Sequence, residues 1–312
     1  MLNFEDLFSG LEKELNGQLR LLQSKSKVKV YCGINKHGGY RISFMSTIAP
    51  PRIDSTKGLK VSHLQEDENV FWTSFDLINQ SAKPVFFSLC DDLLAVINEH
   101  IVEQDALTAL KNRFFAWQNL FMQNSSTLSE EKIIGLLGEL YFLYNCLIPK
   151  FSPQYAIDAW SGPEGANKDF STEQSWYEVK TASVNINTVK INSPAQLSSP
   201  LTGYLVILRY ETMSEQYNDE ASNIIHLFRK IMSLLNNDEL KSKFISKLLV
   251  CGFDVNGDSY KKKYRIDSMN FYKVENGFPR ITEQDIKFPE IDKVTYTLHI
   301  NSLENFKVEE VK

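Results

Sequence analysis

The sequence predicts an α/β protein in which a mixed sheet flanked by helices follows a β-rich N-terminal module. Three patterns predict this class. Short strand-like runs separated by turn residues occupy residues 26–90. Apolar residues at helical spacing then dominate residues 91–144. Strand patterns return afterwards, with a hairpin at 168–180 and a buried strand at 204–210.

The β-rich region is preceded by a helical pattern and consists of five short runs. Apolar residues recur near helical spacing from Phe4 to Leu22, which predicts one amphipathic helix over residues 1–25. The turn Asn35–Gly39 joins the first two strand-like runs into a hairpin. The five runs are 28–32, 40–45, 59–64, 70–75 and 85–89.

Helices are predicted next. Two helical patterns cover 91–102 and 105–123, and Thr127 with Glu130 three residues later forms a capping box. This box predicts a helix that runs to about Tyr144 and is ended by the prolines after it. Two later helices are expected, and the last third alternates strands and turns. The prolines are Pro149 and Pro153. The later helices are expected over 215–235 and 237–249.

The length of 312 residues fits one large domain or two ordinary ones. The pattern divides the chain into a β-rich recognition or interaction module at 1–100, an α/β core at 101–250 and a β-rich extension at 251–312. The four cysteines are widely spaced and form no CxxC motif, which argues against a zinc scaffold and favours a reducing cytoplasm.

Charge and hydropathy exclude several classes of protein. The net charge of −5 argues against a protein that coats DNA. Residues 225–265 are nevertheless basic, so Lys241–Arg265 could line a DNA groove, although a solvated face is the commoner meaning of such a run. No uncharged apolar run approaches the roughly 18 residues of a membrane span. The five histidines show no metal-binding spacing.

The chemistry is concentrated in a predicted hairpin that turns over residues 172–175. The symmetric register pairs residues whose numbers sum to 347, so Asp169 lies opposite Glu178. Cross-strand neighbours have Cβ atoms about 4.5–5.5 Å apart, so the two carboxylates would repel unless a cation lies between them. Glu178 and Lys180 share a face of the strand, and the carbonyl of Val179 lies beside them.

This set of groups suits magnesium and phosphate chemistry. Two carboxylates, a carbonyl and waters form the octahedral oxygen shell that Mg²⁺ prefers. An adjacent lysine can orient or deprotonate a water and stabilise charge on a phosphate. We therefore predict a site that hydrolyses phosphodiesters.

A third carboxylate is expected from the apolar helix before the hairpin. Glu139 is the only charged residue in 133–143, and a lone buried carboxylate is costly unless it is paired, protonated or bound to metal. Gly135 and Gly138 would let this helix pack closely on the sheet. Glu139 could then reach the edge of the Asp169/Glu178 pair.

The order of these residues resembles a known superfamily. Helical Glu139, then Asp169, then Glu178-Val179-Lys180, then Gln196 resembles the PD-(D/E)xK superfamily of restriction-endonuclease-like nucleases. The Gly138-to-Tyr141 helix and the spacing from Trp160 to Asp169 resemble, more specifically, the PD-(D/E)xK-motif proteins of bacterial restriction and phage-defence gene clusters. The resemblance covers about residues 127–200, and Lys168 stands where the nominal proline would be.

The resemblance implies a restriction-endonuclease-like core and divalent-metal-dependent cleavage of DNA, with Mg²⁺ as cofactor and Mn²⁺ as a substitute. Asp169, Glu178 and Glu139 would hold the metal together with the Val179 carbonyl, and Lys180 would be catalytic. Gln196, expected in a helix, would support the site or contact a phosphate. The implied partners are DNA, a second copy in a homodimer and other proteins of a defence cluster, with no membrane.

Each residue also has an ordinary structural role open to it. Asp169 could flank a turn, Glu139 could form a structural ion pair, and Gln196 could satisfy backbone groups after Pro194. Two other functions also fit the sequence. One is a non-cleaving DNA-binding or scaffold subunit of a defence complex, and the other is a nuclease that acts on RNA or on branched DNA.

Overall fold

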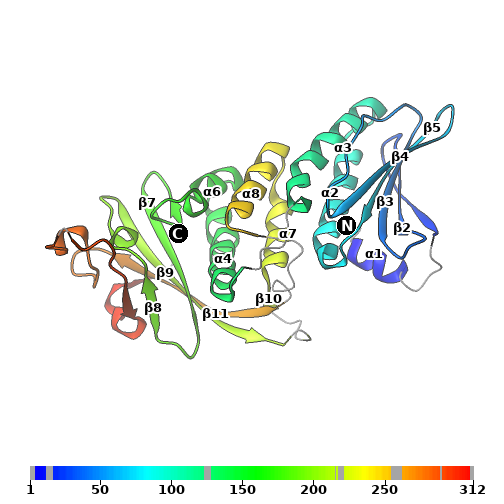
Figure 1. Ribbon diagram of the computed structural model, residues 1–312. Coiled ribbons are helices and arrows are strands. Elements are labelled where there is room, and N and C mark those ends of the chain that lie inside the picture. Colours follow the sequence, from blue (N-terminus) through cyan, green and yellow to red (C-terminus); the bar gives the residue numbers. More distant parts are fainter. Residues whose placement is uncertain are drawn as a thin grey trace. The chain divides into compact units, whose positions relative to one another are not determined.

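The computed structural model describes residues 4–11, 17–122, 128–214, 216, 221–253, 262–288 and 290–309. The chain forms two compact units (Figure 1). The first unit comprises Met1–Thr127 and Asn236–Asp258, and the second comprises Leu128–Leu235 and Ser259–Lys312. This grouping differs from the predicted boundaries at 100 and 250, because residues on both sides of each boundary pack together.

The first unit contains an antiparallel five-stranded sheet of order β1-β2-β3-β5-β4. The predicted hairpin is confirmed, since β2 pairs with β3 across the turn at 35–39. The predicted strand runs at 59–64 and 70–75 are likewise strands, β4 and β5. The bounds are β1 (Leu19–Leu22), β2 (Lys29–Ile34), β3 (Tyr40–Ser46), β4 (Leu59–Asp67) and β5 (Val70–Leu77).

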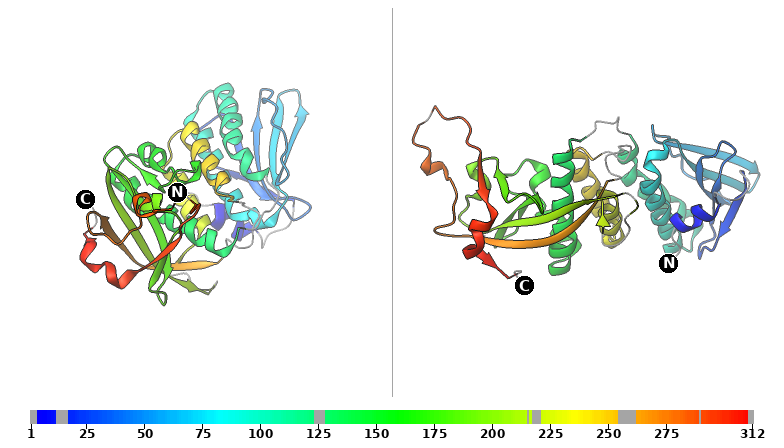
Figure 2. Two further views of the ribbon diagram at one scale, coloured as in Figure 1. Left: turned by 60° about the vertical axis from the view of Figure 1, so that its left-hand side comes forward. Right: turned by 90° about the horizontal axis from the view of Figure 1, so that it is seen from below.

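Helices of the first unit cover one face of this sheet with an aromatic core (Figures 1 and 2). The ring of Phe8 stacks on Phe87 with centroids 4.9 Å apart, and Phe75 lies 4.9 Å from Phe114. These helices are α1 (Phe4–Leu11), α2 (Lys83–Glu99) and α3 (Glu103–Gln118), and α8 (Asp238–Val250) packs on α3.

Two predictions for this unit are wrong. The described N-terminal helix ends at Leu11, and Leu19–Leu22 is a strand because its backbone pairs with β2. Residues 85–89 belong to α2 and not to a strand. A short, wholly buried apolar run has the same composition in a strand and in a helix, so periodicity could not separate them.

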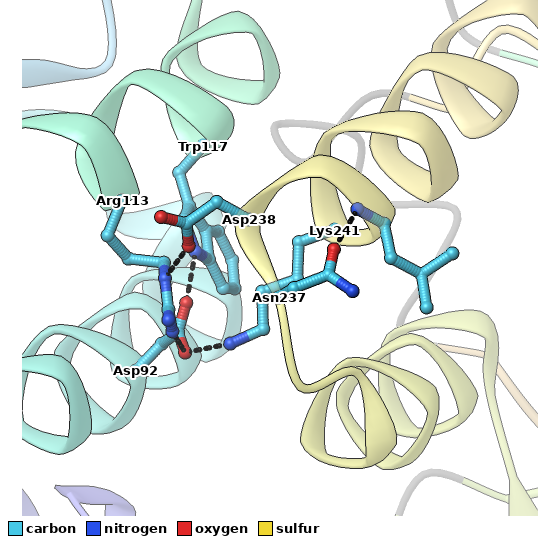
Figure 3. Close-up of polar contacts among 7 residues, drawn as sticks. Asp92, Arg113, Trp117, Asn237, Asp238 and Lys241 are labelled. Atoms are coloured by element: carbon cyan, nitrogen blue, oxygen red, sulfur yellow. Dashed lines mark hydrogen bonds and ion pairs between the residues drawn. The ribbon is translucent and has the colours of Figure 1, made fainter. Parts of the chain in front are cut away.

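A buried charged network joins α8 to α2 and α3 (Figure 3). Arg113 Nη1 lies 2.5 Å from Asp92 Oδ1, and Trp117 Nε1 donates to Asp92 Oδ2 at 2.7 Å. Lys241 also pairs with Asp92, and Arg113 pairs with Asp238. These contacts explain why residues 236–258 group with the first unit.

The basic residues of Lys241–Arg265 therefore do not gather into the predicted DNA groove. Lys241 and Lys247 are buried in the first unit, with exposed fractions of 5% and 4%. In the second unit Lys262 pairs with Glu130 and Arg265 pairs with Glu211. Lysine and arginine stems bury readily when a carboxylate is at hand, so a basic stretch of sequence does not imply a basic surface.

The second unit contains a mixed sheet of order β10-β11-β9-β7-β6, with β13 also paired to β11. Strands β7 and β9 are parallel, whereas β6 and β11 run antiparallel to their neighbours. The bounds are β6 (Phe170–Ser171), β7 (Ser175–Ser183), β9 (Thr202–Met213), β10 (Ala221–Ser222), β11 (Lys263–Val274) and β13 (Lys307–Val308). A separate pair consists of β8 (Thr188–Ile191) and β12 (Tyr296–His299).

Helices of the second unit pack on the mixed sheet, with α4 in contact with both β7 and α7. Ser129 caps α4 by accepting a hydrogen bond from Lys132 N at 3.4 Å, while the predicted cap Thr127 lies outside the described residues. The helices are α4 (Glu130–Phe142), a π-helical turn (Leu143–Leu147), α5 (Ile148–Lys150), α6 (Pro153–Ala159) and α7 (Ile224–Leu234). Short 3-10 turns are Gln80–Ala82, Asn119–Phe121, Gly162–Glu164, Pro194–Leu197, Glu283–Asp285 and Ile300–Phe306.

The stretch Glu130–Lys150 continues through the site where Pro149 was expected to end the helix, because a proline is tolerated in a first helical turn. By length and composition alone, this helix is long and apolar enough to cross a membrane. The prediction from the sequence does not identify it, because that prediction considers only uncharged apolar runs. However, 56% of its most apolar window is buried inside the protein, and it packs against β7 and α7, as a core helix does.

Candidate active site

The hairpin of β6 and β7 has the predicted register. Phe170 pairs with Tyr177 and Ser171 with Trp176, and Thr172 N donates to Ser175 O at 2.8 Å to close the turn. Extension of this register by one residue places Asp169 opposite Glu178. Alternation along β7 then puts Glu178 and Lys180 on one face of the strand and Val179 on the other.

Helix α4 approaches β7 at a glycine. A Cβ atom at Gly138 would lie 2.4 Å from Thr181 Cγ2 and 3.6 Å from Val179 Cγ1, so a side chain there would force the helix off the strand. The predicted role of Gly138 in close packing is confirmed. The same prediction for Gly135 is wrong, because a Cβ at Gly135 would contact nothing within 4 Å.

The position of Gly138 delivers the next residue, Glu139, toward Asp169. A Cβ atom built on Gly162 would lie 3.5 Å from Glu139 Oε2 and 3.3 Å from Asp169 Oδ1, so both carboxylates border one point. Glu139 Oε2 accepts a hydrogen bond from Trp160 Nε1 at 2.7 Å, and Asp169 Oδ2 accepts one from Val179 N at 2.7 Å. Both residues are half-buried.

Glu178 and Lys180 form an ion pair on the face of β7 that points away from Val179 and from Gly138 of α4. Glu178 Oε1 lies 2.7 Å from Lys180 Nζ, and Glu178 as a whole is 0% exposed. Its Oε2 is buried without a hydrogen-bond partner among the described residues. Lys180 Nζ also lies 3.5 Å from Gln196 Oε1, which accepts a shorter bond of 2.7 Å from Asn192 N. Gln196 occupies a 3-10 turn, not the predicted helix.

The site holds more carboxyl groups than lysines, and the carboxyl groups are held toward their protonated forms. The pKa of Glu178 rises to about 8 because it is buried and because Asp169 lies nearby. Burial and the charge of Asp169 likewise raise the pKa of Glu139 to about 8 against the hydrogen bond from Trp160. Burial raises the pKa of Asp169 as well, despite the opposing charge of Lys180. Burial alone would lower the pKa of Lys180, but Glu178 and Asp169 outweigh it and raise this pKa.

A divalent cation suits the donors of this site by chemical type. Within the described part of the chain, no three His, Cys, Asp or Glu side chains converge as a ready metal-binding group. Each carboxylate instead contacts a protein donor. The unsatisfied Glu178 oxygen and the raised pKa values of the carboxyl groups are nevertheless what a hard cation with oxygen ligands would relieve.

Two further cations hold the turn that carries Gln196, and the sequence analysis did not foresee them. The side chain of Lys168 is buried, and its Nζ donates to the carbonyls of Ala195 and, at 3.0 Å, Ser198. It also lies 4.2 Å from the centroid of the Trp176 ring. Arg280 Nη1 donates to Leu197 O at 2.5 Å. A lysine in place of the nominal proline, directly before Asp169, was the available signal.

Together the mixed sheet, the helix packed on it and the acidic hairpin define a restriction-endonuclease-like fold. Residues 4–301 match the model of a family described as "Putative PD-(D/E)XK family member (DUF4420)". Since this match spans nearly the whole chain, the protein belongs to that PD-(D/E)XK family, and the predicted resemblance is confirmed. No curated protein and no solved structure matches the chain.

Proposed function

We propose that this protein is a divalent-metal-dependent nuclease that hydrolyses DNA phosphodiester bonds with an activated water. The observation that supports this proposal is Glu178, a wholly buried carboxylate with one oxygen lacking a donor. Asp169 lies near enough to raise its pKa further, and Lys180 forms an ion pair with it. Buried charge of this kind is costly unless a cation neutralises it, and such perturbed groups concentrate at functional sites.

The carboxylates of the site would hold the metal, and Lys180 would act on the phosphate. Asp169, Glu178, Glu139 and the Val179 carbonyl would hold Mg²⁺, or Mn²⁺ in its place. A bound cation of this kind supplies Lewis-acid stabilisation and lowers the pKa of a bound water. Lys180 keeps its proton at neutral pH because of its carboxylate neighbours, so it would act as a cation toward the phosphate. Gln196 would restrict where the Lys180 ammonium lies.

The biological setting follows from the resemblance of the motif to proteins of restriction and phage-defence clusters. We place the protein in bacterial defence, in the cytoplasm, with DNA as substrate and with a homodimer or other cluster proteins as partners. The first unit would supply recognition or partner contacts, because the proposed chemistry belongs entirely to the second unit.

A second function has one observation in its favour. Glu139, Asp169 and Glu178 each already contact a protein donor, and no three such groups converge among the described residues. This arrangement suits a non-cleaving DNA-binding or scaffold subunit that retains a nuclease fold.

A plasmid cleavage assay with Mg²⁺ tests the proposal. Wild type should nick or linearise plasmid, and Asp169→Asn should lower the rate about a thousandfold by removing a charged ligand. Glu173→Gln makes the same change of charge in an exposed turn of the same hairpin, so it should leave the rate unchanged. Titration calorimetry with Mn²⁺ on the same proteins gives an independent measure of metal binding.

The combined results separate the alternatives. Cleavage that survives Asp169→Asn would show that the site is misassigned. Absence of both cleavage and Mn²⁺ binding would favour the scaffold function. Mn²⁺ binding that depends on Asp169, without plasmid cleavage, would direct the assay to RNA and branched DNA or to missing partners.

A further inference from the structure

The first unit contains a pocket of about 380 Å³ at one end of its five-stranded sheet. Residues of β1, β3, β4 and β5 line it together with the turn between β2 and β3. Its volume lies within the range of roughly 300–1,000 Å³ that is usual for small-molecule sites. All the residues that line it belong to the first unit, so the carboxylates of the candidate nuclease site contribute nothing to it.

The pocket arises from one row of residues that crosses the sheet. The register aligns one residue from each strand, and the second member of the row is a glycine. This row is Leu19, Gly33, Arg41, Asp76 and Lys60. A Cβ at Gly33 would lie 2.2 Å from Gln18 O and 3.0 Å from Leu19 Cδ2, so only glycine fits there. Gln18 O and Leu19 therefore fill the space beside Gly33, and the hollow lies against the other four members of the row and the adjoining turn.

Arg41 is held in a fixed orientation beside this hollow. Its Nε and Nη2 each lie 2.7 Å from the Asp76 carboxylate, which is 5% exposed. Asn35 Nδ2 donates to the same carboxylate at 2.8 Å, while Asn35 Oδ1 accepts bonds from His37 N and Gly39 N. The arginine fork and the turn that follows Asn35 are thus fixed to one buried group, an arrangement that lowers the entropy cost of binding an anion.

The lining combines cationic and apolar side chains. Arg41, Lys36 and Lys60 face one carboxylate, Asp76, although the chain as a whole is acidic. Lys36 and Lys60 are exposed and form no ion pair within the described residues. Ile78 and Leu19, which are 56% and 36% exposed, supply the apolar part.

We propose that this pocket binds a single nucleotide unit, either as a free nucleotide or as the phosphorylated end of a strand. The phosphate would lie against Arg41, Lys36 and Lys60, and the sugar and base against Leu19 and Ile78. The two lysines and the fixed guanidinium suit a phosphate. The apolar side chains beside them suit a flat, weakly polar group attached to that phosphate. The proposal depends on the first unit alone and not on cleavage by the second.

Titration calorimetry of the full chain in EDTA tests it, because binding is then measured without metal or cleavage. The probes are AMP, adenosine, inorganic phosphate, and a short oligodeoxynucleotide with or without a 5′-phosphate. The double variant Lys36→Gln/Lys60→Gln should weaken binding of AMP at least about tenfold, since charge-assisted hydrogen bonds are lost. Lys29→Gln is the matched control, because Lys29 is exposed on β2 outside the pocket.

The outcomes decide both the site and its ligand. Tighter binding of the 5′-phosphorylated oligonucleotide than of AMP assigns the pocket to a strand end, and the reverse order assigns it to a free nucleotide. Equal affinity of wild type and double variant for AMP would overturn the proposal, as would failure of wild type to bind any phosphorylated probe. Because both substituted lysines are exposed, loss of folding should not confuse the result, and circular dichroism verifies this.

Discussion

Each unit of the protein buries a cluster of charged side chains, and the two clusters differ in balance. In the first unit Asp92 and Asp238 face Arg113 and Lys241, so carboxylates and cations are equal in number. In the second unit the carboxyl groups of Glu139, Asp169 and Glu178 outnumber the two lysines whose charges act on them, Lys168 and Lys180, and two of the three carboxyl groups have a pKa near 8.

This difference separates a structural use of buried charge from a functional one. In a balanced network each charged group has a partner of opposite charge, and the network holds three helices together. Its ion pairs offset the cost of removing the charges from water. An unbalanced cluster must either keep protons or take up a cation, so it stays responsive to pH and to ligands. The balance of charge, more than burial itself, distinguishes the two sites.

The strongest test of this comparison removes one carboxylate charge from each cluster. Asp92→Asn leaves Arg113 and Lys241 buried with too little negative charge, so it should lower the free energy of unfolding of the first unit by about 3–5 kcal/mol. Glu178→Gln relieves excess negative charge, so the metal-free protein should be as stable as wild type or more stable. Urea denaturation in EDTA measures both.

The exposed pair Arg52 and Asp54 supplies the control. Their side chains are 86% and 74% exposed, so Asp54→Asn should change stability by no more than about 1 kcal/mol. Similar losses of stability for Asp92→Asn and Glu178→Gln would show that the two clusters serve the same structural purpose.

The second test uses pH. The carboxyl pKa values of Glu139 and Glu178 rise from a usual 4.5 to about 8, so between these limits the folded protein binds more protons than the unfolded chain. Stability of the metal-free second unit should therefore fall as pH rises from about 5 to about 8 and then level off. Thermal melts across this range measure the effect.

Added Mn²⁺ is the comparison that sharpens this result. A cation held by the carboxylates favours their charged forms, so melts with Mn²⁺ should lose this decline and show a higher melting temperature at pH 8. The Glu139→Gln/Glu178→Gln variant should show neither effect. A decline that persists in that variant would assign the titration to other groups.

The smallest expected effect concerns the support of the site. Lys168→Met removes the ammonium that holds the carbonyls of Ala195 and Ser198, so the turn with Gln196 should loosen. We expect about a tenfold loss in kcat/KM, carried mainly by kcat, with Asp169-dependent Mn²⁺ binding retained. Lys190→Met, at an exposed position of β8, is the control. An unchanged kcat would limit Lys168 to a purely structural role.

Parts of the fold and of the site could be predicted because they depend on neighbours in sequence. The hairpin register follows from a short turn, since the turn length determines which residues lie opposite each other. The role of Gly138 follows from its place in an apolar helix that must approach a strand. The family itself was evident from the order of Glu139, Asp169, Glu178 and Lys180.

Other features could not be predicted from local sequence patterns. Whether 85–89 forms strand or helix depends on what packs around it, and the membership of α8 in the first unit depends on Lys241 meeting Asp92 from 149 residues away. The basic stretch at 225–265 therefore looked like a surface, whereas its ion pairs divide it between two units.

The sequence by itself determined several of the strands, the acidic hairpin and the family, because these rest on periodicity, turn length and the order of residues along the chain. Only the tertiary structure decided which charges are buried together, that Lys168 and Arg280 hold the Gln196 turn, and that one row of the N-terminal sheet lines a pocket with cationic side chains. Those outcomes depend on contacts between residues distant in sequence, whose burial and partners are known only once the chain has folded.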